Sequence, residues 1–332
     1  MSGRSRYKDY DPSGANVELR ESDIAIFELL QEFPYLSLPY IGELLGAKPQ
    51  TVTVNGKQVV RYEYLRKKLM RLRKDGGYLR CPADSWKAAN SRWRPAVYAL
   101  TAKGKAVLRE QGLFPSFKLG NDFAHDFGSC VVPASFKIGV MTNPSLRFIQ
   151  PREIIEHRAC PESTRISPEP FTIPVRFTFQ GRTIETNKEH DWSPWGIGYR
   201  LDDGRERKIF FPGHEFDRST EPLETDDLGR SSVTRHLLSI LSLLDGGYKR
   251  HFGLPSVYIP IVTVGERRLK SIMRQLLKLT DGKGSQKILF KHIPDFASYG
   301  SLPAATGHML TEPWERAGHE SFDILKEIGA TV

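Results

Sequence analysis

The chain has 332 residues, of which 39% are hydrophobic and 26% charged, and its formal net charge is +9. This composition lies far from that of disordered chains, and the length suggests two globular domains. There is no apolar run long enough to cross a bilayer, no signal-peptide-like start and no CxxC pair. We therefore expect a cytoplasmic protein without a membrane span, a disulfide framework or a cysteine-rich zinc site.

The positive charge is concentrated in one stretch. Between Lys57 and Arg109 there are 15 Lys or Arg residues and three acidic residues, a local net charge of +12. Such a cluster favours a polyanionic partner, because each neutralised phosphate releases condensed counterions. A solvated surface without a partner is the alternative interpretation.

Three helices are predicted early in the chain, after a polar lead-in at residues 1–20. The first begins with Ser22 as its cap and ends before Pro34, the second covers Ser37–Leu45, and the third runs from about Arg61 to Lys74. The third helix places apolar residues on one face and basic residues elsewhere. The apolar residues are Tyr62, Leu65, Leu69 and Leu72.

Two strands, Tyr78–Cys81 and Ala96–Leu100, follow the third helix and are joined by a basic loop. This order of elements is that of a winged helix-turn-helix domain, which we assign to residues 21–113. A small hairpin around Asn55-Gly56 is inserted between the second and third helices. This insertion can alter how the third helix docks.

Basic residues of the third helix and the wing are the predicted DNA contacts. They are Arg61, Arg66, Lys67, Lys68, Arg71, Arg73, Lys74, Lys87, Arg92 and Arg94. Because winged helices also bind proteins, a protein adaptor without a DNA role is an alternative, and it predicts no salt-dependent DNA binding.

The second domain is predicted over residues 121–300, with a Pro-rich connection at 144–174 and a C-terminal tail at 301–332. Its strands and helices alternate in the order of an α/β sandwich. The expected strands are 175–179, 183–186, 196–201, 208–211, 257–264 and 287–293, and the expected helices are 228–244 and one around 269–276. Pro260 suggests that its strand bulges or lies near a sheet edge.

Two segments resemble the replication-relaxation proteins of plasmids and mobile elements. They are FFPGHEFDRST at 210–220, which contains the family's Glu-x-Asp-Arg motif, and VYIPIVTVGERR at 257–268. The resemblance implies a winged helix followed by a core similar to the restriction-endonuclease fold, so that the protein is α/β within that core and α+β overall. It also implies an accessory or regulatory role in replication, relaxation or transcription of such elements.

Glu215 and Asp217 are two residues apart on a predicted strand, so both carboxylates are expected on one face, where they can share a divalent cation. Active nucleases of this fold usually carry the PD-(D/E)XK motif. Here Trp195 follows Pro194 where an Asp is expected, and Asp217 takes the position of the Lys. Asp191 is a candidate for the missing Asp. An acidic pair that contacts Arg218, Arg230 or Arg235, without a metal, is the alternative.

The sequence therefore predicts a sequence-recognising protein that binds double-stranded DNA and is associated with the nucleoid or a plasmid. We expect no small-molecule substrate and no required cofactor, and a homodimer would suit paired half-sites. The alternative is a divergent endonuclease that uses Glu215 and Asp217 as catalytic and metal-binding residues with Mg²⁺ or Mn²⁺.

Overall fold

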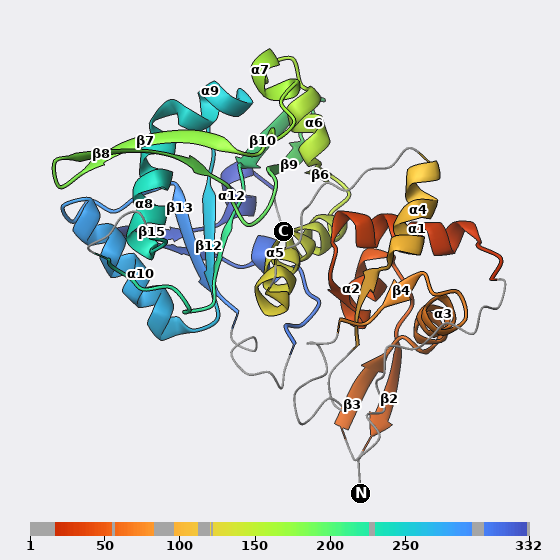
Figure 1. Ribbon diagram of the computed structural model, residues 1–332. Coiled ribbons are helices and arrows are strands. Elements are labelled where there is room, and N and C mark those ends of the chain that lie inside the picture. The colour runs from red at the N-terminus through yellow and green to blue at the C-terminus, as the bar shows by residue number, and fades with distance from the viewer. Residues whose placement is uncertain are drawn as a thin grey trace, which may run out of the picture. The chain divides into compact units, whose positions relative to one another are not determined.

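The computed structural model describes residues 17–54, 57–82, 96–111, 120, 122–225, 230–293 and 302–330. They form a mixed α/β protein with several small sheets (Figure 1). The chain divides into two compact units, residues 1–134 with 298–306 and residues 135–297 with 307–332. The division falls inside helix α5 (Phe123–Met141), so the first unit extends beyond the predicted boundary at residue 113.

The first unit contains helices, a three-stranded sheet and a separate two-stranded ribbon. Its antiparallel sheet has the order β1-β5-β4, and β2 pairs only with β3. Its elements are α1 (Glu21–Glu32), β1 (Leu36–Ser37), α2 (Leu38–Leu44), β2 (Gln50–Val54), β3 (Lys57–Arg61), α3 (Glu63–Lys74), β4 (Leu79–Arg80), β5 (Val97–Leu100), α4 (Ala102–Glu110) and the start of α5.

Helix α1 begins two residues earlier than predicted. Its N-cap is Arg20, whose backbone N–H donates to the carboxylate of Asp23 at 3.1 Å. Ser22 therefore lies inside the first turn, and the predicted cap at that residue is wrong. The Asp23 carboxylate, at the third helical position, accepts the N–H of the cap residue, as the acidic residue of a capping box does.

The second unit has three groups of strands. These are the β7–β8 hairpin, a sheet of order β10-β9-β6 and a five-stranded sheet of order β11-β12-β13-β14-β15. The strands are β6 (Leu146–Ile149), β7 (Ile173–Phe179), β8 (Arg182–Lys188), β9 (Trp195–Arg200), β10 (Glu206–Phe211), β11 (Glu215–Asp217), β12 (Ile259–Thr263), β13 (Ile288–His292), β14 (Trp314–Arg316) and β15 (His319–Phe322). The helices are α6 (Pro151–Glu156), α7 (Glu162–Arg165), α8 (Val233–Ser242), α9 (Tyr248–Phe252), α10 (Glu266–Leu279), α11 (His308–Thr311) and α12 (Ile324–Ile328), with an irregular turn at Leu243–Gly247 between α8 and α9.

Strands β11, β12 and β13 run parallel and are connected through α8 and α10. Strand β12 lies second in the sheet, next to the short edge strand β11, which agrees with the predicted position of Pro260 near a sheet edge. The N–H of Ile259 donates to Lys287 on the β13 side, and alternate residues of a strand face opposite neighbours. The nitrogen of Pro260 therefore faces the β11 side, where the ladder begins only at Ile261, and no ladder hydrogen bond is lost.

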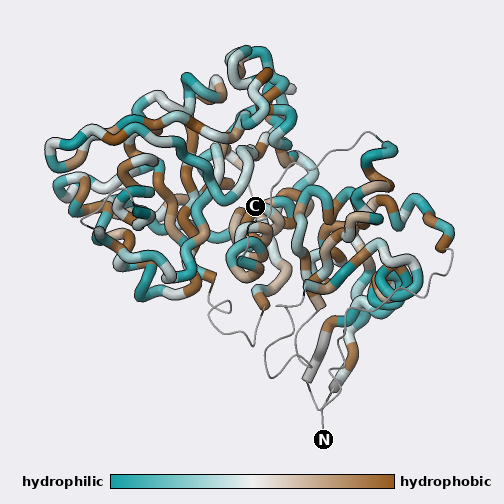
Figure 2. The backbone as a smooth tube through the Cα atoms, viewed as in Figure 1, coloured by the Kyte–Doolittle hydropathy of each residue, from teal (hydrophilic) through white to brown (hydrophobic). Residues whose placement is uncertain are grey.

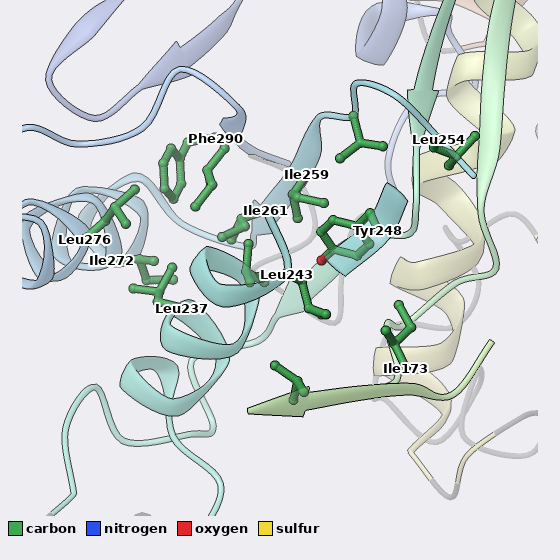
Figure 3. Packing of buried hydrophobic residues seen from close by; sticks show 14 of the residues in the cluster. Ile173, Leu237, Leu243, Tyr248, Leu254, Ile259, Ile261, Ile272, Leu276 and Phe290 are labelled. Carbon is green, nitrogen blue, oxygen red and sulfur yellow. The ribbon is translucent and has the colours of Figure 1, made fainter. Parts of the chain in front are cut away.

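The main apolar core of the second unit lies between the α8 and α10 helices and the strands beside them. Leu237 of α8 and Leu276 of α10 are fully buried, as are Ile259 and Phe290 of the sheet (Figure 3). Apolar stripes at helical spacing explain why both amphipathic helices form and pack here. Along the backbone, hydrophobic residues gather on the central strands, whereas α3 in the first unit is largely hydrophilic (Figure 2).

Two regions are more ordered than the sequence analysis expects. The Pro-rich connection at 144–174 contains β6, α6 and α7, with Pro151 in the first turn of α6, where a proline is tolerated. The predicted tail contributes β14, β15 and α12, and Trp314 and Ile324 are fully buried. Residues 307–330 therefore belong to the second folded unit.

Candidate nucleic-acid interface and the buried Glu215 cluster

Helix α3 has one buried face and one cationic face. Leu65, Leu69 and Leu72 are buried at spacings of four and three residues, which turns the opposite side of the helix to solvent. The first turn carries Glu63, and the last turn carries three cations. This charge order follows the helix dipole and favours the helix in a strongly basic sequence.

Three of the predicted DNA contacts are exposed. Arg61 ends β3, while Arg66 and Lys67 lie on the first half of α3. The guanidinium of Arg66 contacts Glu63, with 3.0 Å between Nε and Oε2, and this pair is open to solvent. Exposed ion pairs of this kind contribute little to stability. Arg66 can therefore leave Glu63 and bind a phosphate at a low cost in free energy.

Two other predicted contacts, Lys68 and Arg71, are directed at α1. The carboxylate of Asp23 is fully buried and lies 2.6 Å from Nη2 of Arg71 and 3.4 Å from Nζ of Lys68. Burial raises the pKa of Asp23, but the Arg20 N–H, Arg71 and Lys68 outweigh burial and hold the pKa below its ordinary value. These cations join α3 to α1, a structural role that the sequence analysis did not assign to them.

Five predicted DNA contacts remain. Arg73 and Lys74 are half-buried at the end of α3. Lys87, Arg92 and Arg94 lie outside the described residues.

Two exposed apolar residues beside the cations were missed by the sequence analysis. Tyr64, on α3, is 74% exposed, and Val60, near the end of β3, is 58% exposed. Tyr64 lies outside the Leu65–Leu69–Leu72 stripe, and this departure from the helical pattern was the available signal. Aromatic and aliphatic side chains left in water beside cations are suited to contact with sugar or base.

In the second unit, Glu215 is the centre of a buried polar cluster. Its Oε2 lies 2.6 Å from Nζ of Lys188 and 3.3 Å from Nδ1 of His236, and its Oε1 lies 2.5 Å from Nδ1 of His190. Nε2 of His190 lies 2.9 Å from the hydroxyl of Tyr248. Because His190 donates from Nδ1 to the carboxylate, its Nε2 accepts a hydrogen bond from the Tyr248 hydroxyl.

The charges in this cluster follow from these contacts. Burial raises the pKa of Glu215, but Lys188, His190 and His236 hold it well below its ordinary value. Burial lowers the pKa of His190, which is consistent with a neutral imidazole. Burial and Lys188 lower the pKa of His236, but Glu215 and Glu221 prevail and raise it to about 9. Glu215 is thus ionised beside two cations, Lys188 and His236.

Asp217 has a separate cationic partner. Arg268 binds it through both carboxylate oxygens, at 2.9 Å from Nε and 2.8 Å from Nη2. Asp191 accepts the backbone N–H of Phe216 at 2.6 Å and so holds the loop before β9 against β11. Among the described contacts, Lys188 and the two histidines bind Glu215, and Arg268 binds Asp217. The sequence predicted Arg218, Arg230 or Arg235 as partners of the pair, and the four observed partners were not among its candidates.

The shared-cation hypothesis for Glu215 and Asp217 gains no support from this arrangement. Within the described ranges, no group of three or more His, Cys, Asp or Glu side chains is placed to hold a metal ion. A cation shared by Glu215 and Asp217 would have to displace Lys188 from one carboxylate and Arg268 from the other. Lys188 was missed because it lies on β8, 27 residues before Glu215, whereas the motif places the lysine on the same strand.

Searches of family models, curated proteins and solved structures found no match to this chain. Among the helices that the structure describes, none is both long and apolar enough to span a membrane.

Proposed function

We propose that the first unit is a winged helix-turn-helix domain that binds double-stranded DNA through α3. The support from topology is the order α1-β1-α2-α3-β4-β5, with β1 joining the edge of the β5–β4 pair. Domains of this kind place their third helix in the major groove and their wing on the backbone.

The observation that carries the proposal is the outward cationic face at the start of α3. Arg61, Arg66 and Lys67 are all exposed, and the nearby Glu63 is bound to Arg66 in a pair that solvent already reaches. A row of cations on a helix with a fixed inner face suits the regular spacing of phosphates along a groove.

The test is neutralisation of exposed cations that have no role in packing. Arg61→Gln with Lys67→Gln is expected to lower the slope of log K against log salt by about 1.8, since each phosphate contact contributes roughly 0.9. The matched control is Lys105→Gln with Arg109→Gln on α4, which removes the same charge from another helix. If both double variants weaken duplex binding equally, α3 is not the interface.

For the second unit we propose a core similar to the restriction-endonuclease fold, with a structural or DNA-contacting role. The resemblance to replication-relaxation proteins is the basis for proposing a biological role. That role is an accessory or regulatory one in replication, relaxation or transcription of plasmids or mobile elements. The parallel β11-α8-β12-α10-β13 arrangement is compatible with such a core.

Metal-dependent cleavage is a second candidate because Lys188 lies against Glu215. An acid and a lysine in contact are two of the three groups that a PD-(D/E)XK site uses. Incubation with supercoiled plasmid and Mg²⁺ or Mn²⁺ separates the candidates. Retardation with intact supercoils supports a binding protein, and nicking that is lost in Glu215→Gln establishes an endonuclease.

A further inference from the structure

The β2–β3 ribbon interrupts the helix-turn-helix between α2 and α3. Its ladder has five residue pairs, from Gln50 opposite Arg61 at the base to Val54 opposite Lys57. Five residues of strand span about 17 Å at roughly 3.3 Å per residue. Arg61 ends the ribbon and α3 begins at Glu63, so the ribbon is continuous with the proposed DNA-binding helix.

The described side chains of the ribbon face that carries Thr51, Thr53 and Val60 are all exposed, so no core covers them. Figure 1 shows the ribbon extending away from the helices of its unit. Of the ribbon side chains that the structure describes, Gln50, Thr51, Thr53, Val60 and Arg61 are exposed and Val52 is half-buried. An isolated two-stranded hairpin is marginally stable in water, and an exposed Val contributes nothing to its stability. The ribbon therefore has the properties of an element that is completed by a partner.

The charge of the ribbon identifies the class of partner. From Lys48 to Arg61 the sequence has three basic residues, Lys48, Lys57 and Arg61, and no acidic residue. A second copy of this surface would bring like charges together, whereas a polyanion neutralises them. The exposed Thr and Gln side chains can hydrogen-bond to phosphates and base edges, and the methyl groups of Val60 suit a thymine methyl.

We propose that the β2–β3 ribbon is a second DNA-contacting element, which follows a groove of the duplex beyond the site of α3. The major groove of B-DNA admits a two-stranded ribbon as well as a helix. At 3.4 Å per base pair, a ribbon of this length extends the bound site by about five base pairs. This inference rests on the proposed function, because it requires that α3 itself binds DNA.

The decisive variant removes the ribbon and keeps its base. Deleting Thr51–Val54 and Lys57–Val60 leaves Asn55-Gly56 to join Gln50 to Arg61, which already face each other across the ladder. A two-residue Asn-Gly connection is suited to a hairpin turn. The site size of this variant is measured by titrating a series of random-sequence duplexes of increasing length, alongside the full chain.

A point variant covers the case in which the deletion does not fold. Val60→Asp places a negative charge at an exposed position that no core depends on. Ile166→Asp, at a residue of the second unit that is 75% exposed, is the matched control.

The expected result is that the deletion shortens the minimal duplex for full affinity by about five base pairs. Val60→Asp should weaken duplex binding about tenfold or more, with Ile166→Asp near wild type. An unchanged site size and an unaffected Val60→Asp would overturn the inference while leaving the proposed function intact. A deletion that changes only the oligomeric state would also overturn it and assign the ribbon to self-association. Failure of the full chain to bind any duplex would instead refute the proposed function.

Discussion

At the scale of single residues, Asp23 separates the structural cations of α3 from those available to a ligand. Asp23→Asn should lower the free energy of unfolding by about 2 kcal/mol, because it removes charge-assisted bonds from a buried site. Glu63→Gln, in the exposed pair with Arg66, should change it by less than about 0.5 kcal/mol. Urea denaturation at neutral pH checks both values.

The effect of Asp23→Asn on stability should depend on pH. The pKa of Asp23 is lowered in the folded protein, so its contribution to stability is present above its ordinary value of 3.8 and is lost as the pH falls through the folded value. The difference in free energy of unfolding between wild type and Asp23→Asn should therefore shrink as the pH is lowered. A difference that stays constant would show that Asp23 acts through packing alone.

His236 should be protonated at neutral pH. It bridges Glu215 and Glu221 at 3.3 Å each, and these carboxylates raise its pKa to about 9 against the effects of burial and Lys188. A raised pKa adds stability that is complete below the ordinary value of 6.5 and is lost as the pH rises through about 9. Between pH 7 and 10, wild type should lose more stability than His236→Gln, and an imidazole titration by NMR measures the pKa directly. A titration midpoint of His236 near pH 6.5 would contradict its pairing with Glu215 and Glu221.

At the scale of elements, the end of α9 depends on the absence of a side chain. Gly253 has φ of +73°, and a Cβ there would lie 1.9 Å from the carbonyl oxygen of Ala159. Gly253→Ala should lower the free energy of unfolding by roughly 2–3 kcal/mol, because it strains and displaces the backbone. Gly282→Ala, with φ of +81° and open space around it, should cost about 1 kcal/mol. If thermal denaturation shows that both variants lose the same stability, the contact between residue 253 and Ala159 is not tight.

Elements with strong periodicity were predictable from the sequence. The apolar stripe of α3 and those of α8 and α10 each specify a helix with one buried face, and Asn55-Gly56 between Val-rich segments predicts the two strands that form. Contacts between distant residues were not predictable. Lys188 and Glu215 meet although β8 and β11 belong to different sheets, and no local pattern encodes that approach.

At the scale of the whole molecule, two folded units were predictable, but their limits were not. Strands β14 and β15 have three and four residues, which is too few for a period of two to stand out, so residues 301–332 read as a tail. The fully buried Trp314 shows that this segment completes the five-stranded sheet. Helix α5 similarly crosses the limit between the units, whereas the second domain was expected to begin at residue 121.

The most direct test of the central claim is the salt dependence of binding between the full chain and a fluorescent duplex. Exposed cations on α3 predict binding that weakens steeply between about 50 and 200 mM salt, with a log–log slope of roughly −0.9 for each phosphate contacted. Arg61→Gln with Lys67→Gln should make that slope shallower. Absence of binding at the lowest salt, or binding that salt does not weaken, would contradict the account of this protein as a DNA-binding protein.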